Sequence, residues 1–107
     1  MTLSGAIELP FSRDSVIRVL SYGASPETSP YNHNQIAEWC NRFCYHYRNI
    51  DTKQAMEELL SVVFDVDVQW ELYLVNTYSI DELRSKSFDD ETMPLHWFRD
   101  WLKEVEN

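Results

Sequence analysis

The segment from Asn32 to Arg48 constrains the fold more than any other, because several helix signals agree on it. Asn32 can accept a hydrogen bond from the unpaired N–H groups of a first helical turn, and Gln35 completes a capping-box pattern. At about 100° per residue, one face then collects the apolar side chains Ile36, Ala37, Cys40, Phe43, Cys44 and Tyr47. The segment therefore predicts an amphipathic helix that packs into a core.

Helix-start signals of the same kind recur along the chain. Ser12 is a suitable N-cap for a first helix, which we expect to end with Gly23 in the left-handed conformation. Asp51 is expected to cap a third helix, Ser79 a fourth and Thr92 a last one. The pattern of starts and apolar faces predicts helices rather than a sheet.

We expect residues 1–107 to form one globular domain with a mainly α fold, a compact bundle of about five helices. Residues 3–9 alternate weakly between apolar and polar, and they predict either a short extended arm over the core or a frayed end. Residues 66–75 fit a strand at a period of two, and they also fit a helix that continues an apolar stripe from Val63. We favour the helix, because the strand would have only the weak arm as a partner, and one strand pair is marginally stable.

The net charge of −9 is concentrated in the second half of the chain. Residues 1–50 carry four basic and four acidic side chains, whereas residues 51–107 carry five basic and fourteen acidic ones. Such a surface repels phosphate backbones and anionic lipids, so we expect neither nucleic acid nor membrane as a partner. A basic protein would be attracted to it. The alternative is that the charge serves solubility alone.

Sequence motifs for familiar chemistries are missing. With two glycines the chain has no phosphate-cradling loop, and it contains neither H-E-x-x-H nor G-x-S-x-G. We therefore predict no cofactor and favour a non-catalytic protein. The N-terminus lacks the pattern of a signal peptide, no apolar run is long enough to span a bilayer, and two cysteines do not make a disulfide framework. We expect a cytoplasmic protein.

One metal-binding arrangement is conceivable within the Asn32 helix. His33, Cys40 and Cys44 are seven and four residues apart, so they share a stripe, and imidazole and thiolate are good zinc ligands. The chain has no closely spaced cysteine pair of the zinc type, and free cysteines commonly pack as small apolar side chains. We favour core packing and keep a metal-binding domain or metal-dependent enzyme as the alternative function.

The last helix carries the best interaction signal. Its apolar stripe is complete without Trp97 and Trp101, and exposed tryptophan is enriched at binding hot spots. The alternative is that both tryptophans widen the buried stripe. Together with neighbouring acidic side chains they give the predicted partner-binding residues Asp89, Asp90, Glu91, Trp97, Asp100, Trp101 and Glu104.

The function that the sequence favours is a non-catalytic, acidic protein-binding module that engages a basic protein partner. An inhibitor, an immunity-type protein and an adaptor all fit this description. A homodimer formed through the apolar flank of the last helix is a third interpretation.

Overall fold

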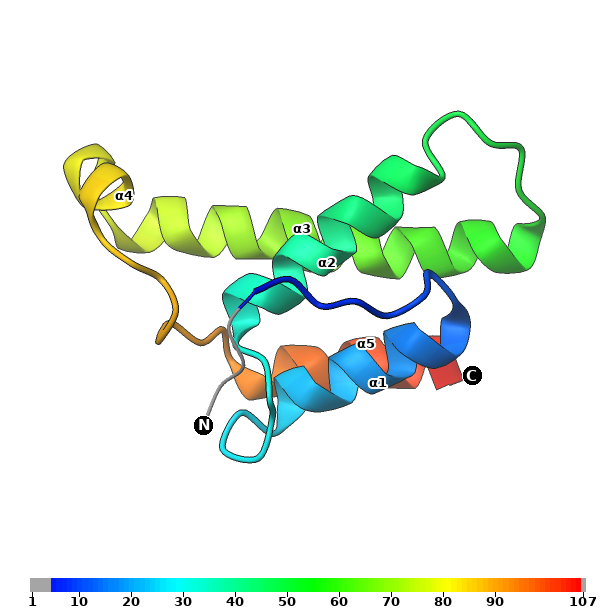
Figure 1. Ribbon diagram of the computed structural model, residues 1–107, viewed down its shortest axis with the longest axis horizontal. Coiled ribbons are helices and arrows are strands. Elements are labelled where there is room, and N and C mark those ends of the chain that lie inside the picture. Colours follow the sequence, from blue (N-terminus) through cyan, green and yellow to red (C-terminus); the bar gives the residue numbers. More distant parts are fainter. Residues whose placement is uncertain (1–4, 107) are drawn as a thin grey trace.

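The computed structural model describes residues 5–106, and helices account for most of them (Figure 1). The five helices are α1 Arg13–Ala24, α2 His33–His46, α3 Gln54–Thr77, α4 Ile80–Ser85 and α5 Leu95–Glu106. No strand occurs within the described part of the chain. The prediction of a mainly α bundle of about five helices is confirmed.

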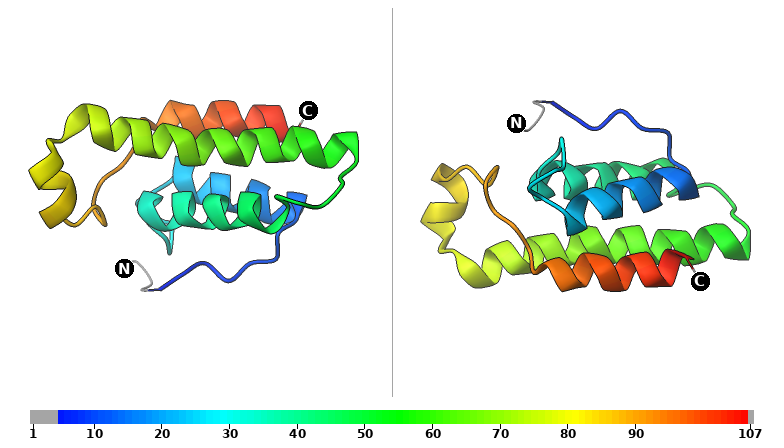
Figure 2. Two further views of the ribbon diagram at one scale, coloured as in Figure 1. Left: turned by 90° about the horizontal axis from the view of Figure 1, so that it is seen from above. Right: turned by 90° about the horizontal axis from the view of Figure 1, so that it is seen from below.

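The helices pack in two layers, which Figure 2 shows edge-on. One layer holds α1 and α2, and the other holds α3 and α5. The main contacts between the layers join α1 to α5 and α2 to α3. α3 runs along the long dimension of the molecule, and α4 lies beyond the end of the two layers. The radius of gyration is 13.7 Å, close to the value of about 13 Å for a compact chain of 100 residues.

The ambiguous segment at residues 66–75 lies in the middle of α3, as the favoured interpretation predicted. Val66 and Trp70 are buried against the core, as the helical stripe requires. The same helical phase brings Asp67 toward the inner side, where it remains half-buried and accepts a hydrogen bond from Asn41 Nδ2 at 3.1 Å. A carboxylate at this edge is therefore accommodated by a polar partner on α2.

Three helix starts follow the predicted caps. Ser12 Oγ accepts a hydrogen bond from the Ser15 N–H at 3.3 Å at the start of α1. Complete capping boxes are present at Asn32 and at Ser79. In each, the cap side chain accepts from the backbone N–H three residues later, and the side chain of that residue accepts from the backbone N–H of the cap.

The prediction for Gly23 is wrong. α1 continues to Ala24, and Gly23 does not adopt the left-handed conformation expected of a helix stop. The glycine is instead required by close packing, because a Cβ atom there would lie 2.3 Å from ring atoms of Phe98 on α5. A side chain on Gly23 would hold the two helices apart.

Two predicted caps are also wrong. α3 begins at Gln54 after Lys53, not after Asp51, and Lys53 makes no side-chain cap. The connection from α2 is a wide loop, because the start of α3 lies beyond the end of α2 (Figure 1). α5 begins at Leu95 rather than after Thr92, and the Met93 N–H that precedes it donates to His33 Nδ1.

The N-terminal segment forms an extended arm over the core, as one of the two predictions for it stated. Ile7 is fully buried, and α2 holds the arm by three hydrogen bonds to its carbonyls. These run from Gln35 Nε2 to Gly5 O at 2.6 Å, from Arg42 Nη2 to Ile7 O at 2.9 Å and from Trp39 Nε1 to Leu9 O at 3.3 Å. Residues 3 and 4 of the predicted arm lie outside the described residues. None of the described helices combines the length and apolar character needed to cross a bilayer.

Candidate functional site

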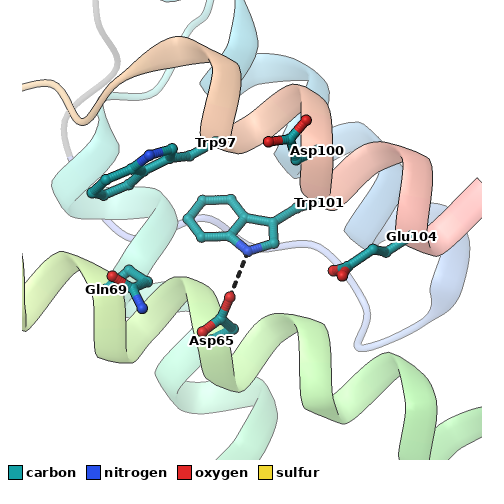
Figure 3. A pocket seen from close by; sticks show the side chains of 6 residues that line it. All are labelled: Asp65, Gln69, Trp97, Asp100, Trp101 and Glu104. Carbon is teal, nitrogen blue, oxygen red and sulfur yellow. Dashed lines mark hydrogen bonds between the residues drawn. The ribbon is translucent and has the colours of Figure 1, made fainter.

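A groove between α3 and α5 contains part of the predicted partner-binding set. Its volume is about 390 Å³. α5 contributes four predicted residues, and α3 contributes two that were not predicted (Figure 3). The lining residues are Trp97, Asp100, Trp101 and Glu104 from α5 and Asp65 and Gln69 from α3.

Helical spacing explains how both walls are built. The four residues on α5 follow one another at intervals of three, one and three, which places them on one side of a helix. Asp65 and Gln69 are four apart and share a side of α3 for the same reason. α5 is anchored beneath its groove side by the buried residues Phe98 and Val105. The groove is therefore held by two packed helices and not by loops.

The two tryptophans have different positions in the groove. Trp101 is only 5% exposed, and its Nε1–H donates to Asp65 Oδ2 at 2.8 Å. Trp97 is half-buried, with its ring centroid 6.4 Å from that of Trp101 at an interplanar angle of 68°. Trp97 also contacts Tyr73 edge-to-face at 6.3 Å. Trp101 thus belongs to the core and forms the floor, whereas Trp97 forms a wall that keeps part of its ring in solvent.

Three carboxylates surround the tryptophans. Asp65, Asp100 and Glu104 are exposed, and no basic residue is among the six that line the groove. Figure 3 shows Glu104 reaching from α5 toward α3, with Asp100 remaining on the α5 side. Carboxylates beside indole rings, which are negative on their faces, produce a site that attracts cations.

The acidic loop does not contribute to this groove. Asp89 and Asp90 are exposed and line a separate pocket of about 160 Å³ beside Tyr31 and His33. The Glu91 carboxylate accepts a hydrogen bond from the Tyr78 hydroxyl. The structure therefore places four of the seven predicted residues in the groove and two in the second pocket, and the seventh, Glu91, bonds Tyr78 instead.

His33 is a structural residue at the junction of three segments. Its side chain is 1% exposed. Nε2–H donates to Gly23 O at 2.9 Å, and Nδ1 accepts the Met93 N–H at 2.8 Å. This pattern requires the neutral ring, because a protonated imidazole has no acceptor. Burial lowers the pKa of His33, which favours the same neutral form.

The two cysteines are free thiols, and their surroundings favour the protonated form. Burial raises the pKa of Cys40 well above its usual range. Burial and the charge of Asp67 raise the pKa of Cys44 to about 11. Within residues 5–106, no three histidine, cysteine or acidic side chains converge as metal ligands would. His33 and Cys40 are thus buried in the core, and Cys44 packs against it.

Asp65 and Gln69 are the site residues that sequence reasoning missed. Both lie in or beside the segment whose secondary structure was ambiguous, and their spacing of four residues was the available signal. What could not be predicted is that α3 lies along α5, which brings Asp65 within hydrogen-bonding distance of Trp101, 36 residues away.

The groove offers groups that suit the binding of a cation. Its lining consists of three carboxylates, one amide and two indoles. These groups can hold a cation by charge and by ring contact. Comparison of the chain with protein-family models, with curated proteins and with solved structures finds no match in any of the three.

Proposed function

We propose that the protein is a non-catalytic binding module that engages a basic protein partner through the groove between α3 and α5. The observation that carries this proposal is the convergence of Asp65, Asp100 and Glu104 on Trp97 and Trp101. Inhibitors, immunity-type proteins and adaptors share this kind of function, and the proposal concerns the binding step that they have in common.

An arginine or lysine side chain of the partner is the group that suits the groove. Its cation would lie against the exposed part of Trp97, a contact that contributes roughly 0.5–2 kcal/mol. The carboxylates of Asp100 and Glu104 would accept its N–H groups in charge-assisted hydrogen bonds. Trp97 is only half-buried, so binding would bury more of an aromatic side chain of the kind that dominates interfaces.

The overall charge supports the same choice of partner. The excess negative charge lies in residues 51–107, which form both walls of the groove. Charge of one sign on a surface raises the rate of association with an oppositely charged protein, and salt screens this effect. We propose a cytoplasmic setting, since Cys40 and Cys44 are both free thiols, as is usual in a reducing compartment.

Affinity capture with the full chain tests the proposal. Three baits are compared. They are the wild-type protein, the groove variant Asp100→Asn/Glu104→Gln, and the control Asp81→Asn/Glu106→Gln, which removes the same charge from exposed positions outside the groove. We expect wild type and control to retain a basic protein from extracts of the source cells at low salt, and to release it as salt rises. The groove variant should retain much less.

Two results would contradict the proposed function. One is equal retention of the same partner by wild type and the groove variant. The other is a retained partner that is acidic, or one whose affinity does not change between low and high salt. Either result would show that partner binding does not depend on the negative charge of the groove.

A further inference from the structure

The outer side of α3 carries an apolar stripe that the core does not use. Phe64, Leu72 and Val75 are 58%, 48% and 60% exposed, and Val68 between them is half-buried. At about 100° per residue, these four side chains lie on one side of the helix. The opposite side holds the buried residues Leu59, Val62, Val63, Val66 and Trp70. α3 is therefore apolar on two opposite sides, and only one of them is covered by this chain.

Carboxylates flank the stripe along both edges. Asp65 lies on the edge that faces α5, where it lines the groove and accepts the Trp101 N–H. Asp67 and Glu71 lie on the edge that faces α2, beside Asn41 in another surface pocket. The 24 residues of α3 include five acidic side chains and no lysine, arginine or histidine. The exposed stripe thus has carboxylates on both edges, Asp65 on one and Asp67 with Glu71 on the other, and these are its two acidic rows.

This charge pattern decides which kind of molecule could cover the stripe. A second copy of the chain would place five acidic side chains of α3 opposite five of the same kind, and like charges across an interface are destabilising. A segment with apolar residues on one side and basic residues on both flanks would instead cover the stripe and form ion pairs with both acidic rows.

We propose that the outer side of α3 docks a basic amphipathic helix of the partner. The apolar side of that helix would cover Phe64, Val68, Leu72 and Val75, and its lysine or arginine flanks would pair with the two acidic rows. Residues 64–75 span roughly 17 Å of helix, so the partner helix needs about three turns. This inference rests on the proposed function, since Asp65 belongs both to the groove and to the edge of the stripe.

A synthetic peptide provides the test without knowledge of the natural partner. The probe is an 18-residue peptide of leucine and lysine patterned as an amphipathic helix. One comparison peptide has the same composition in an order that gives no apolar face, and another has glutamate in place of lysine. Each is titrated into the isotope-labelled full chain, and affinity and chemical-shift changes are followed by NMR. We expect the patterned lysine peptide to bind most tightly, with the largest shift changes at residues 61–76.

Two double variants identify the surface. Phe64→Ser/Leu72→Ser should weaken binding of the patterned peptide by about tenfold or more, because burial of such side chains contributes more than one decade of affinity. Tyr45→Ser/Ile50→Ser removes two exposed apolar side chains from outside α3 and should leave affinity unchanged. Leu72→Gln/Val75→Gln repeats the test with other residues of the stripe. Circular dichroism checks that each variant keeps the helix content of the wild type.

The outcomes separate this inference from the proposed function. Unchanged affinity in both stripe variants, with shift changes confined to the groove, overturns the inference and leaves the proposed function standing. A dimer that is seen by sedimentation and dissociates in Phe64→Ser/Leu72→Ser would identify a second copy as the occupant and also overturn it. Equal binding of lysine and glutamate peptides would count against both.

Discussion

The ring of His33 on α2 and the backbone N–H of Met93, sixty positions later in the chain, are joined by a hydrogen bond of 2.8 Å. The other ring nitrogen donates to Gly23 O in the last turn of α1. One buried imidazole thus fastens the end of α1 and the start of α2 to the segment that leads into α5. The bond to Met93 exists only while Nδ1 has no proton.

Acid should weaken the fold through His33. Burial lowers its pKa in the folded protein below the unfolded value of about 6.5. Above that pH the ring is neutral in both states, so its contribution to stability is complete. Below it the unfolded chain takes up the proton first, and the free energy of unfolding falls until the pH passes the folded pKa, by at most about 1.4 kcal/mol per pH unit.

Urea unfolding between pH 7.5 and 5 measures this effect. His33→Gln should have a flatter dependence of stability on pH across this window, although it is less stable than wild type at pH 7.5. His96→Gln removes an exposed histidine and should keep the wild-type dependence. Parallel curves for wild type and His33→Gln would show that His33 does not link protonation to folding.

Gly23→Ala should destabilise the protein, although alanine is the better helix former. The new methyl group would lie 2.3 Å from Cδ1 and Cε1 of Phe98, which forces α1 and α5 apart or moves the ring. Overpacking of this kind costs typically about 1–3 kcal/mol, more than the gain in helix propensity of up to about 1 kcal/mol.

The free energy of unfolding of three proteins checks this contact. Ser21→Ala changes an exposed residue of the same helix and should have little effect. Gly23→Ala/Phe98→Leu should recover part of the stability that Gly23→Ala loses, because the smaller side chain leaves room for the methyl group. If Gly23→Ala is as stable as wild type, the close approach of α1 and α5 is not what requires glycine.

The helix starts that could be predicted are those that depend on neighbouring residues alone. The capping boxes at Asn32 and Ser79 close between residues three apart, so the local sequence contains all their partners. Gly23 was misjudged because Phe98, the residue that requires a glycine there, is distant in the sequence.

For the same reason, only the α5 side of the candidate site could be predicted from the sequence. The spacing of Trp97, Asp100, Trp101 and Glu104 places them on one side of a helix whatever it packs against. Asp65 becomes a site residue only because α3 lies beside α5, and local patterns carry no information about that pairing. The acidic loop was grouped with the groove because both are acidic, whereas the chain places Asp89 and Asp90 beside His33 instead.

The cysteines should react slowly with alkylating reagents in the folded protein. Burial and the charge of Asp67 raise the pKa of Cys44 to about 11, and the thiolate is the reactive form. At pH 8 its thiolate fraction is roughly 200-fold below that of a free cysteine with a pKa near 8.5. Mass spectrometry after iodoacetamide treatment should show slow labelling of Cys44, which increases with pH, and labelling of the buried Cys40 only after unfolding.

Asp67→Asn isolates the electrostatic part of this effect. It removes the charge that raises the pKa of Cys44, so labelling of Cys44 at pH 8 should become faster. Glu38→Gln removes an exposed charge of α2 and serves as the control. Rapid labelling of wild-type Cys44 at pH 8 would contradict the raised pKa of this thiol and would indicate a reactive cysteine in α2.

The extended arm should contribute to stability through Ile7, which is its one fully buried side chain within residues 5–10. Ile7→Ala should cost about 2–5 kcal/mol, the usual range for removing a large buried aliphatic group. Glu8→Ala changes the exposed neighbour and should stay within about 0.5 kcal/mol of wild type. Urea unfolding measures both values. A loss below about 1 kcal/mol in Ile7→Ala would mean that the arm rests on α2 without stabilising it.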